Sequence, residues 1–214
     1  MVDFAGVWKK FSFVVLFAFL VGGLFDFRIA LFAVVCMIAP VAVSIFRGRF
    51  WCGNVCPRGS FFDTLVAKIE RGKAPPAFLR SYAFRLAVIA CMFTMMGFGV
   101  YRSEGSLLEI GQVIYRLIFV TTVVGVILSL FYNRRAWCAF CPMGTLASLV
   151  SRFSARTGKR LLSVSSSCVS CSLCQKKCPV GIAPHAYKGD HLAEPDCIQC
   201  GICAATCPKK AIGY

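Results

Sequence analysis

Twelve of the chain's 14 cysteines fall into repeated sets with fixed spacing, and the longest repeat lies at the C-terminal end. Its unit reads C-x2-C-x2-C-x3-C-P and occurs twice. The two runs of cysteines are Cys168, Cys171, Cys174 and Cys178, and Cys197, Cys200, Cys203 and Cys207. Three thiols on one tight loop can grip three metal atoms, and the proline after the fourth cysteine turns the chain away. Eight thiols in this order are specific enough to indicate the kind of metal centre that the segment binds.

This spacing is the one by which bacterial two-cluster ferredoxins hold two [4Fe–4S] clusters, with the fourth cysteine of each run ligating the other cluster. The sequence therefore predicts a small α+β ferredoxin-like domain over 168–214. We expect one cluster on Cys168, Cys171, Cys174 and Cys207, and the other on Cys197, Cys200, Cys203 and Cys178. Zinc ribbons seldom repeat four cysteines with two Cys-Pro ends, and a disulfide framework needs an oxidising compartment.

The rest of the chain is too apolar for a soluble ferredoxin. Of its 214 residues 58% are hydrophobic, and uncharged stretches occupy 11–25, 29–46, 86–101 and 117–133. Each is near the lower length limit for crossing a bilayer, about 17 residues, and flanking arginines such as Arg85 can snorkel to add reach. We predict an all-α membrane bundle of four transmembrane helices over 1–153, joined to the ferredoxin-like domain by a linker at 154–167.

Lysine and arginine placement predicts the orientation of this bundle. Basic residues gather before the first stretch, in the second connection and after the fourth stretch, and the members of these groups include Lys9, Lys10, Arg47, Arg49, Arg134 and Arg135. We therefore expect a multi-pass protein of the inner (cytoplasmic) membrane with both termini cytoplasmic. The same pattern accounts for most of the net charge of +15, and it disfavours nucleic acid as a partner.

The predicted bundle reads as one two-helix unit used twice. A Trp-Cys…Cys-Pro-x-Gly loop follows each pair of spans, with Cys52 and Cys56 in the first loop (47–70) and Cys138 and Cys141 in the second (132–153). Each loop leads into a short amphipathic helix that Ser60 or Thr145 is expected to cap. Two copies with two spans each face the same way, so both loops are expected at the cytoplasmic interface.

Four thiols on one face match the ligand count of a third [4Fe–4S] cluster shared between the copies. The spacing differs between the copies, since three residues separate Cys52 from Cys56 and two separate Cys138 from Cys141. Another thiolate metal site, such as zinc, or a pair of redox-active dithiols remains an alternative.

Spans that end in Trp-Cys…Cys-Pro-x-Gly loops and lead to a twin cysteine run resemble the membrane polyferredoxins of the NapH/NosR/CcoG type. The resemblance covers nearly the whole chain. It implies an electron-transfer subunit beside quinol-dependent or periplasmic reductases, or an accessory factor for oxidase maturation. The connection at 102–112 is too short for an external flavin-binding domain, which favours the smaller NapH-like form.

These observations predict a membrane-anchored iron–sulfur subunit that relays electrons between a cytoplasmic donor or acceptor, its [4Fe–4S] clusters and the quinone pool or a partner reductase. The expected partners are the membrane, other redox subunits of a complex, quinone and a soluble ferredoxin-like carrier. No residue pattern indicates acid–base or nucleophilic catalysis, so any enzymatic role is that of an electron-transfer component of an oxidoreductase complex, such as a quinol dehydrogenase. The alternative is an accessory factor that supplies electrons for metal-centre assembly or metal uptake.

Overall fold

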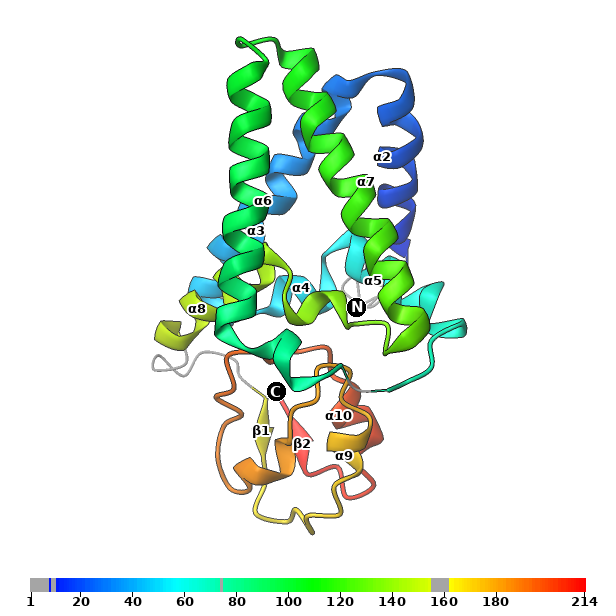
Figure 1. Cartoon of the computed structure of the whole chain (residues 1–214). Coiled ribbons are helices and arrows are strands. Elements are labelled where there is room, and N and C mark those ends of the chain that lie inside the picture. Colours follow the sequence, from blue (N-terminus) through cyan, green and yellow to red (C-terminus); the bar gives the residue numbers. More distant parts are fainter. Residues whose placement is uncertain (1–7, 9–10, 74, 155–161) are drawn as a thin grey trace.

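A computed structural model describes residue 8 and residues 11–73, 75–154 and 162–214. Lys9 and Lys10, which entered the orientation argument, and 155–161 of the predicted linker lie outside the described residues. Apolar helices stand on a platform of short helices, and a small domain lies under the platform (Figure 1). The upright elements are α2 (Phe13–Phe25), η1 (Phe27–Phe32) running into α3 (Ala33–Arg47), α6 (Tyr82–Arg102) and α7 (Leu107–Phe131).

Three helical segments are long and apolar enough to cross a membrane by length and composition: Phe27–Arg47, Tyr82–Arg102 and Leu107–Phe131. They correspond to the second, third and fourth predicted spans. The first predicted span forms α2, which has 13 residues. At 1.5 Å per residue it is about 20 Å long, short of the hydrocarbon core of about 30 Å.

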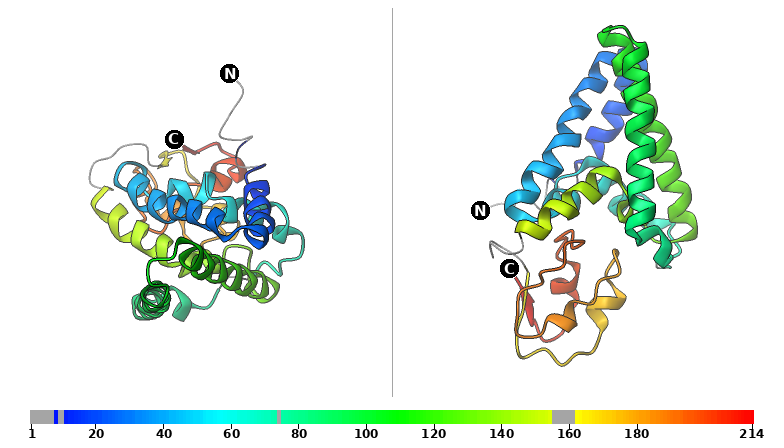
Figure 2. Two further views of the ribbon diagram at one scale, coloured as in Figure 1. Left: turned by 90° about the horizontal axis from the view of Figure 1, so that it is seen from above. Right: turned by 60° about the vertical axis from the view of Figure 1, so that its left-hand side comes forward.

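The upright helices join at the end remote from the platform and diverge towards it (Figure 2). Near the remote end α7 packs against η1 and α2, with Ala30 fully buried and Tyr115 donating a hydrogen bond to the Leu20 carbonyl at 2.9 Å. Gly111 permits this approach, because a Cβ there would lie 2.2 Å from the Phe27 carbonyl oxygen. Outward-facing side chains such as Phe25 and Phe98 are apolar and exposed, which suits a lipid environment.

The platform carries both Cys-Pro loops. It consists of α4 (Phe50–Asn54), α5 (Pro57–Thr64), η2 (Val66–Lys68), η3 (Ala77–Arg80), η4 (Trp137–Ala139) and α8 (Pro142–Ser154). The helices after the loops begin earlier than predicted, at Pro57 and Pro142, because proline at the first helical position has its φ angle already set and has no N–H to satisfy. Cys56, and not Ser60, is therefore the N-cap of α5.

The lower domain is α+β, as expected. It contains β1 (Ser163–Val164), α9 (Leu173–Lys176), η6 (Pro184–Tyr187), α10 (Ile202–Thr206) and β2 (Ile212–Gly213). The two strands pair antiparallel, with Ser163 opposite Gly213. Leu162 and Val164 are each 1% exposed in the domain core. This domain therefore begins within the predicted linker, before Cys168.

One carboxylate fastens the lower domain to the platform. Asp196 receives two hydrogen bonds of 2.9 Å from Arg85, one of 3.3 Å from Arg49 and one of 2.9 Å from Ser148. Both arginines are 2% exposed. Burial acts to raise the pKa of Asp196, but the hydrogen bonds from Arg85 and the two guanidinium charges more than offset it, so the pKa lies below its ordinary value.

This junction corrects the sequence interpretation of two basic residues. Arg85 was expected to flank a span and snorkel, and Arg49 to belong to an interfacial basic group. Both are instead buried and paired with an acidic residue from a segment 100 or more positions away. A buried guanidinium needs such a partner, because an unpaired buried charge costs far more than an exposed one.

Replacing Asp196 by asparagine is expected to loosen the lower domain from the platform, because Arg49 and Arg85 would be left buried without a counter-charge. Removing one partner of a buried ion pair typically costs about 3–5 kcal/mol. Hydrogen exchange of the amides near Gly53 and Gln199, at the junction, should accelerate. The matched control is Asp190→Asn at an exposed position; equal exchange in both variants would contradict the assigned role.

Candidate functional site

The eight cysteines of the lower domain line two separate cavities. Cys168, Cys171, Cys174 and Cys207 border one cavity, and we name these four the distal set. Cys178, Cys197, Cys200 and Cys203 border the other, and we name these four the proximal set. Each cavity therefore combines three cysteines of one run with the fourth cysteine of the other, which is the exchanged grouping expected from the spacing.

The backbone repeats the same unusual geometry in both runs. Ser170 and Ser172 have positive φ angles of 52° and 60°, and the corresponding Gln199 and Gly201 have 51° and 77°. These left-handed residues bend the chain tightly between successive cysteines. The bends hold each loop around its cavity, so that three sulfurs can face one occupant.

Backbone N–H groups point at the sulfur of each fourth cysteine. The Ile182 N–H donates to Cys178 Sγ and the Ala211 N–H donates to Cys207 Sγ, both at 3.4 Å. Such bonds favour the thiolate form that binds metal. At Cys178 burial outweighs this bond and raises the pKa of the thiol. Burial also raises the pKa of Cys197 to about 12. Metal binding must therefore displace a proton from this thiol.

The platform brings together the remaining four predicted cysteines, which we name the interfacial set: Cys52, Cys56, Cys138 and Cys141. Cys56 and Cys141 stand directly before Pro57 and Pro142 at the starts of α5 and α8. The thiols interact electrostatically, since the charges of Cys141 and Cys138 both act on Cys52. Burial raises the pKa of Cys56 to about 12. Two further cysteines, Cys36 and Cys91, are exposed on α3 and α6.

Two buried arginines cross between the loops in a reciprocal pattern. Arg49 lies three residues before Cys52 and donates from Nη2 to the carbonyl oxygen of Cys138 at 2.9 Å. Arg135 lies three residues before Cys138 and donates from Nη1 to the carbonyl oxygen of Cys52, also at 2.9 Å. The same Nη1 atom lies 3.6 Å from Cys138 Sγ. Each loop is thus held by the arginine of the other.

Glycine residues leave space for the guanidinium groups that cross between the two loops. A Cβ at Gly59 would lie 2.7 Å from Nη1 of Arg135, and one at Gly144 would lie 2.5 Å from Nη2 of Arg49. The glycine of each Cys-Pro-x-Gly motif therefore admits the guanidinium that comes from the other loop. Sequence reasoning treated both arginines as orientation signals, although their shared position three residues before a cysteine could have identified them.

Acidic side chains hold the outer edges of the two guanidinium groups. Arg135, which is 1% exposed, pairs with Asp63 through bonds of 2.6 Å and 3.1 Å. Asp63 also pairs with Arg134, which reaches Glu70 at 2.7 Å. Arg49 reaches Asp196 in the same way. Both guanidinium groups are therefore fixed on two sides, by a loop carbonyl and by a carboxylate.

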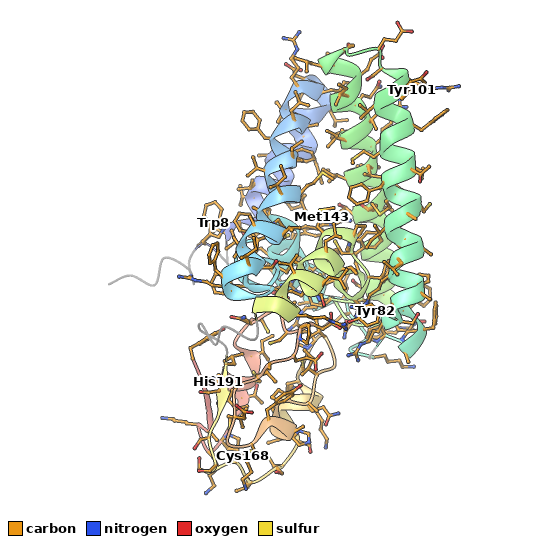
Figure 3. All side chains as sticks on the ribbon, turned by 90° about the vertical axis from the view of Figure 1, so that its left-hand side faces the viewer. Trp8, Tyr82, Tyr101, Met143, Cys168 and His191 are labelled. Atoms are coloured by element: carbon orange, nitrogen blue, oxygen red, sulfur yellow. The ribbon has the colours of Figure 1, made fainter. Side chains whose placement is uncertain are left out.

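The proximal set lies against the interfacial set. Cys52 packs against the core of the lower domain. A Cβ at the neighbouring Gly53 would lie 2.0 Å from the Ile198 carbonyl oxygen, and Asn54 donates to the Gln199 carbonyl at 3.0 Å. Ile198 and Gln199 line the proximal cavity. Cys168 of the distal set lies at the end of the molecule remote from the helices (Figure 3).

An apolar cavity adjoins the interfacial set on the side of the upright helices. Its lining comes from α3, α6 and α7 above and from the loops below, and includes Met37, Met96, Ile118, Trp137 and Cys141. Arg58 also lines it and stacks on the Trp137 ring, 4.9 Å from the centroid. Nε and Nη2 of Arg58 and Nε1 of Trp137 are buried without hydrogen-bond partners among the described residues. Burial lowers the pKa of Arg58, although the charges of nearby thiols act to raise it.

The three cysteine sets fit the [4Fe–4S] clusters that their spacing predicts. Each of the three sets offers four sulfur donors, the ligand number of a [4Fe–4S] cluster. A single zinc ion gathers all four sulfurs around one centre at about 2.3 Å, whereas each cysteine of a [4Fe–4S] cluster binds a different iron atom. In the described parts of the chain no three or more His, Cys, Asp or Glu side chains form a group that could hold a single metal ion.

Comparisons with known proteins agree on the iron–sulfur chemistry. A family described as "4Fe-4S binding domain" matches twice, at 29–74 and 115–160, and a family described as "4Fe-4S dicluster domain" matches at 167–212. The first family covers both Cys-Pro loops, and the second covers the distal and proximal sets.

Two curated relatives come from Methanocaldococcus jannaschii. The uncharacterized protein MJ0749 is 28% identical over 70% of this chain, and the uncharacterized protein MJ0750 is 24% identical over 68%. The chain spans 58% and 65% of the lengths of these relatives. No solved structure matches the chain. The three family matches and the cysteine sets show that the chain carries 4Fe–4S ferredoxin-type domains, which indicate iron–sulfur electron transfer.

Proposed function

We propose that this protein is a membrane-anchored subunit that relays electrons between a soluble carrier on the cytoplasmic side and the quinone pool. The observation that carries the proposal is the succession of three cysteine sets, which leads from the remote end of the lower domain to an apolar cavity. In this proposal each set holds one [4Fe–4S] cluster, and the clusters supply one-electron transfer.

The relay order follows from the contacts of the sets. The distal set lies furthest from the helices, and Cys171 within it is exposed. The proximal set shares the lower domain with the distal set and contacts the residues beside Cys52. The interfacial set borders the apolar cavity through Cys141. An electron that enters at the distal set therefore has a continuous route to the membrane side.

We assign the carrier to the face around the distal set. Val169 and Leu173 line the distal cavity and are 60% and 41% exposed. All five lysines of the domain are exposed: Lys176, Lys177, Lys188, Lys209 and Lys210. Apolar side chains within a basic surface fit an acidic soluble carrier, such as a ferredoxin, whose opposite charge would steer the encounter.

We assign quinone to the apolar cavity. A quinone ring carries two carbonyl oxygens that accept hydrogen bonds. The N–H groups of Arg58 and Trp137 that have no partner among the described residues can donate to these oxygens. Phe93, which lines the cavity, is 39% exposed, so we place the exit of an isoprenoid tail into lipid beside this side chain. The position beside Cys141 favours quinone over a partner reductase as the exit for electrons.

The membrane arrangement is part of the same proposal. We propose four spans in two copies of one unit, with α2 as a short first span and the platform at the cytoplasmic face. The double match of one family and the reciprocal contacts of Arg49 and Arg135 support the duplication. Reducing conditions on the cytoplasmic side would keep twelve thiols available as ligands.

The exchanged grouping can be tested with single serine variants. Cys178→Ser should remove the cluster of the proximal set, although Cys178 belongs to the distal run in sequence, and Cys207→Ser should remove that of the distal set. Anaerobic EPR of dithionite-reduced protein separates the two centres, because removing either also ends their magnetic coupling. Loss of the distal signal in Cys178→Ser would contradict the grouping.

The quinone assignment can be tested by filling the cavity. The full chain is purified anaerobically in detergent, reduced with dithionite and mixed with a soluble menaquinone analogue. Ile118→Phe should slow the loss of the reduced-cluster signal at least tenfold, because the ring would occupy the cavity. Ile127→Phe, on the same helix but 48% exposed, should react at the wild-type rate. A signal that persists in the wild type would contradict quinone as the acceptor.

A further inference from the structure

We propose that Arg49 and Arg135 raise the reduction potential of the interfacial centre above the potentials of the other two centres, so that electrons collect there. The inference rests on the proposed function, because it takes Cys52, Cys56, Cys138 and Cys141 as the ligands of a cluster. It adds a direction to the relay: electrons run downhill from the lower domain towards the membrane.

The first argument is the position of the two guanidinium groups. Arg135 Nη1 lies 3.6 Å from Cys138 Sγ, and Arg49 Nη2 lies 2.9 Å from the carbonyl oxygen of the same cysteine. Reduction adds one negative charge to a cluster and its thiolates. A positive group at hydrogen-bond range of the sulfurs stabilises that added charge and so raises the potential.

The second argument is the charge balance of the buried network. Its ion pairs join four arginines, Arg49, Arg85, Arg134 and Arg135, to three carboxylates, Asp63, Glu70 and Asp196. A fifth arginine, Arg58, lies beside Cys141 and takes part in none of these pairs. Two positive charges are therefore left over around the interfacial set, where burial limits screening by solvent. Burial alone would disfavour the more negative reduced state, and this surplus opposes that effect.

The third argument is the contrast with the lower domain. No arginine occurs after Arg160 in the sequence. Arg49 and Arg85 reach the domain from outside it, but both are paired there with the carboxylate of Asp196, and Arg80 donates to the Gly181 carbonyl at 3.4 Å. The five lysines of the domain are exposed, where water and salt screen their charges. The hydrogen bonds to Cys178 Sγ and Cys207 Sγ come from neutral backbone N–H groups. Buried positive charge is thus concentrated on the interfacial set, which makes it the centre most stabilised on reduction.

The test is an EPR-monitored redox titration of the full chain in detergent. The interfacial signal is identified as the one that Cys56→Ser removes. Arg49→Gln and Arg135→Gln should each weaken reduction of that centre at least tenfold, which is 59 mV for a one-electron couple, and shift the other two centres less. Asp196 keeps Arg85 and Asp63 keeps Arg134 in these variants, so the carboxylates stay paired.

A variant that should shift the interfacial reduction potential in the opposite direction distinguishes a charge effect from general damage to the fold. Asp63→Asn removes a negative charge behind Arg135 and should raise the interfacial potential, whereas Arg102→Gln, on the far end of α6, should change none. The inference would be overturned if the interfacial reduction potential stayed the same in both glutamine variants, or if it also fell in Asp63→Asn. Either result would leave the proposed electron relay itself uncontradicted. Absence of any signal assigned to the interfacial set would overturn the proposed function itself.

Discussion

Four buried guanidinium–acceptor contacts hold this protein together at the level of its platform. Arg49 and Arg135 each bind the cysteine carbonyl of the opposite loop, and each is paired on its other side with Asp196 or Asp63. An arginine can serve two acceptors at once because its planar group presents five N–H donors in a fixed fork. The loops, the lower domain and the interfacial thiols are positioned by the same few groups.

If the interfacial set holds a cluster as proposed, this arrangement couples folding to the presence of that anionic group. A surplus of buried positive charge is unfavourable when the neighbouring thiols are protonated, and burial favours the protonated form of Cys56. Binding of the proposed cluster would convert these thiols to thiolates and supply the missing negative charge. The platform is therefore expected to be most stable with its centre assembled, and the junction at Asp196 then aligns the proximal set with it.

The sequence was most informative where the chemistry is local. The grouping of Cys168, Cys171 and Cys174 follows from spacing alone, because a single loop presents all three thiols. Apolar stretches likewise predicted the three long helices. The first apolar stretch has 15 residues in the sequence, and the structure forms the 13-residue helix α2 within it, because an apolar run does not show where a helix begins.

Long-range pairing was the part that could not be predicted. Arg49 and Arg85 looked like flanking charges, because a basic residue beside a span has the same sequence signature whether it faces lipid headgroups or a distant aspartate. Only the fold brings Asp196 to them. The start of the lower domain was also placed too late, because β1 has two residues and its partner β2 lies some 50 positions further on.

The interfacial centre is the element on which the account depends most, and its composition can be measured directly. The full chain, purified anaerobically, is assayed for iron, acid-labile sulfide and zinc per polypeptide. The account predicts about twelve iron atoms and about twelve sulfides, four of each for every cluster, with no stoichiometric zinc. About eight of each together with one zinc would show that the interfacial set holds a different centre, and would contradict the relay.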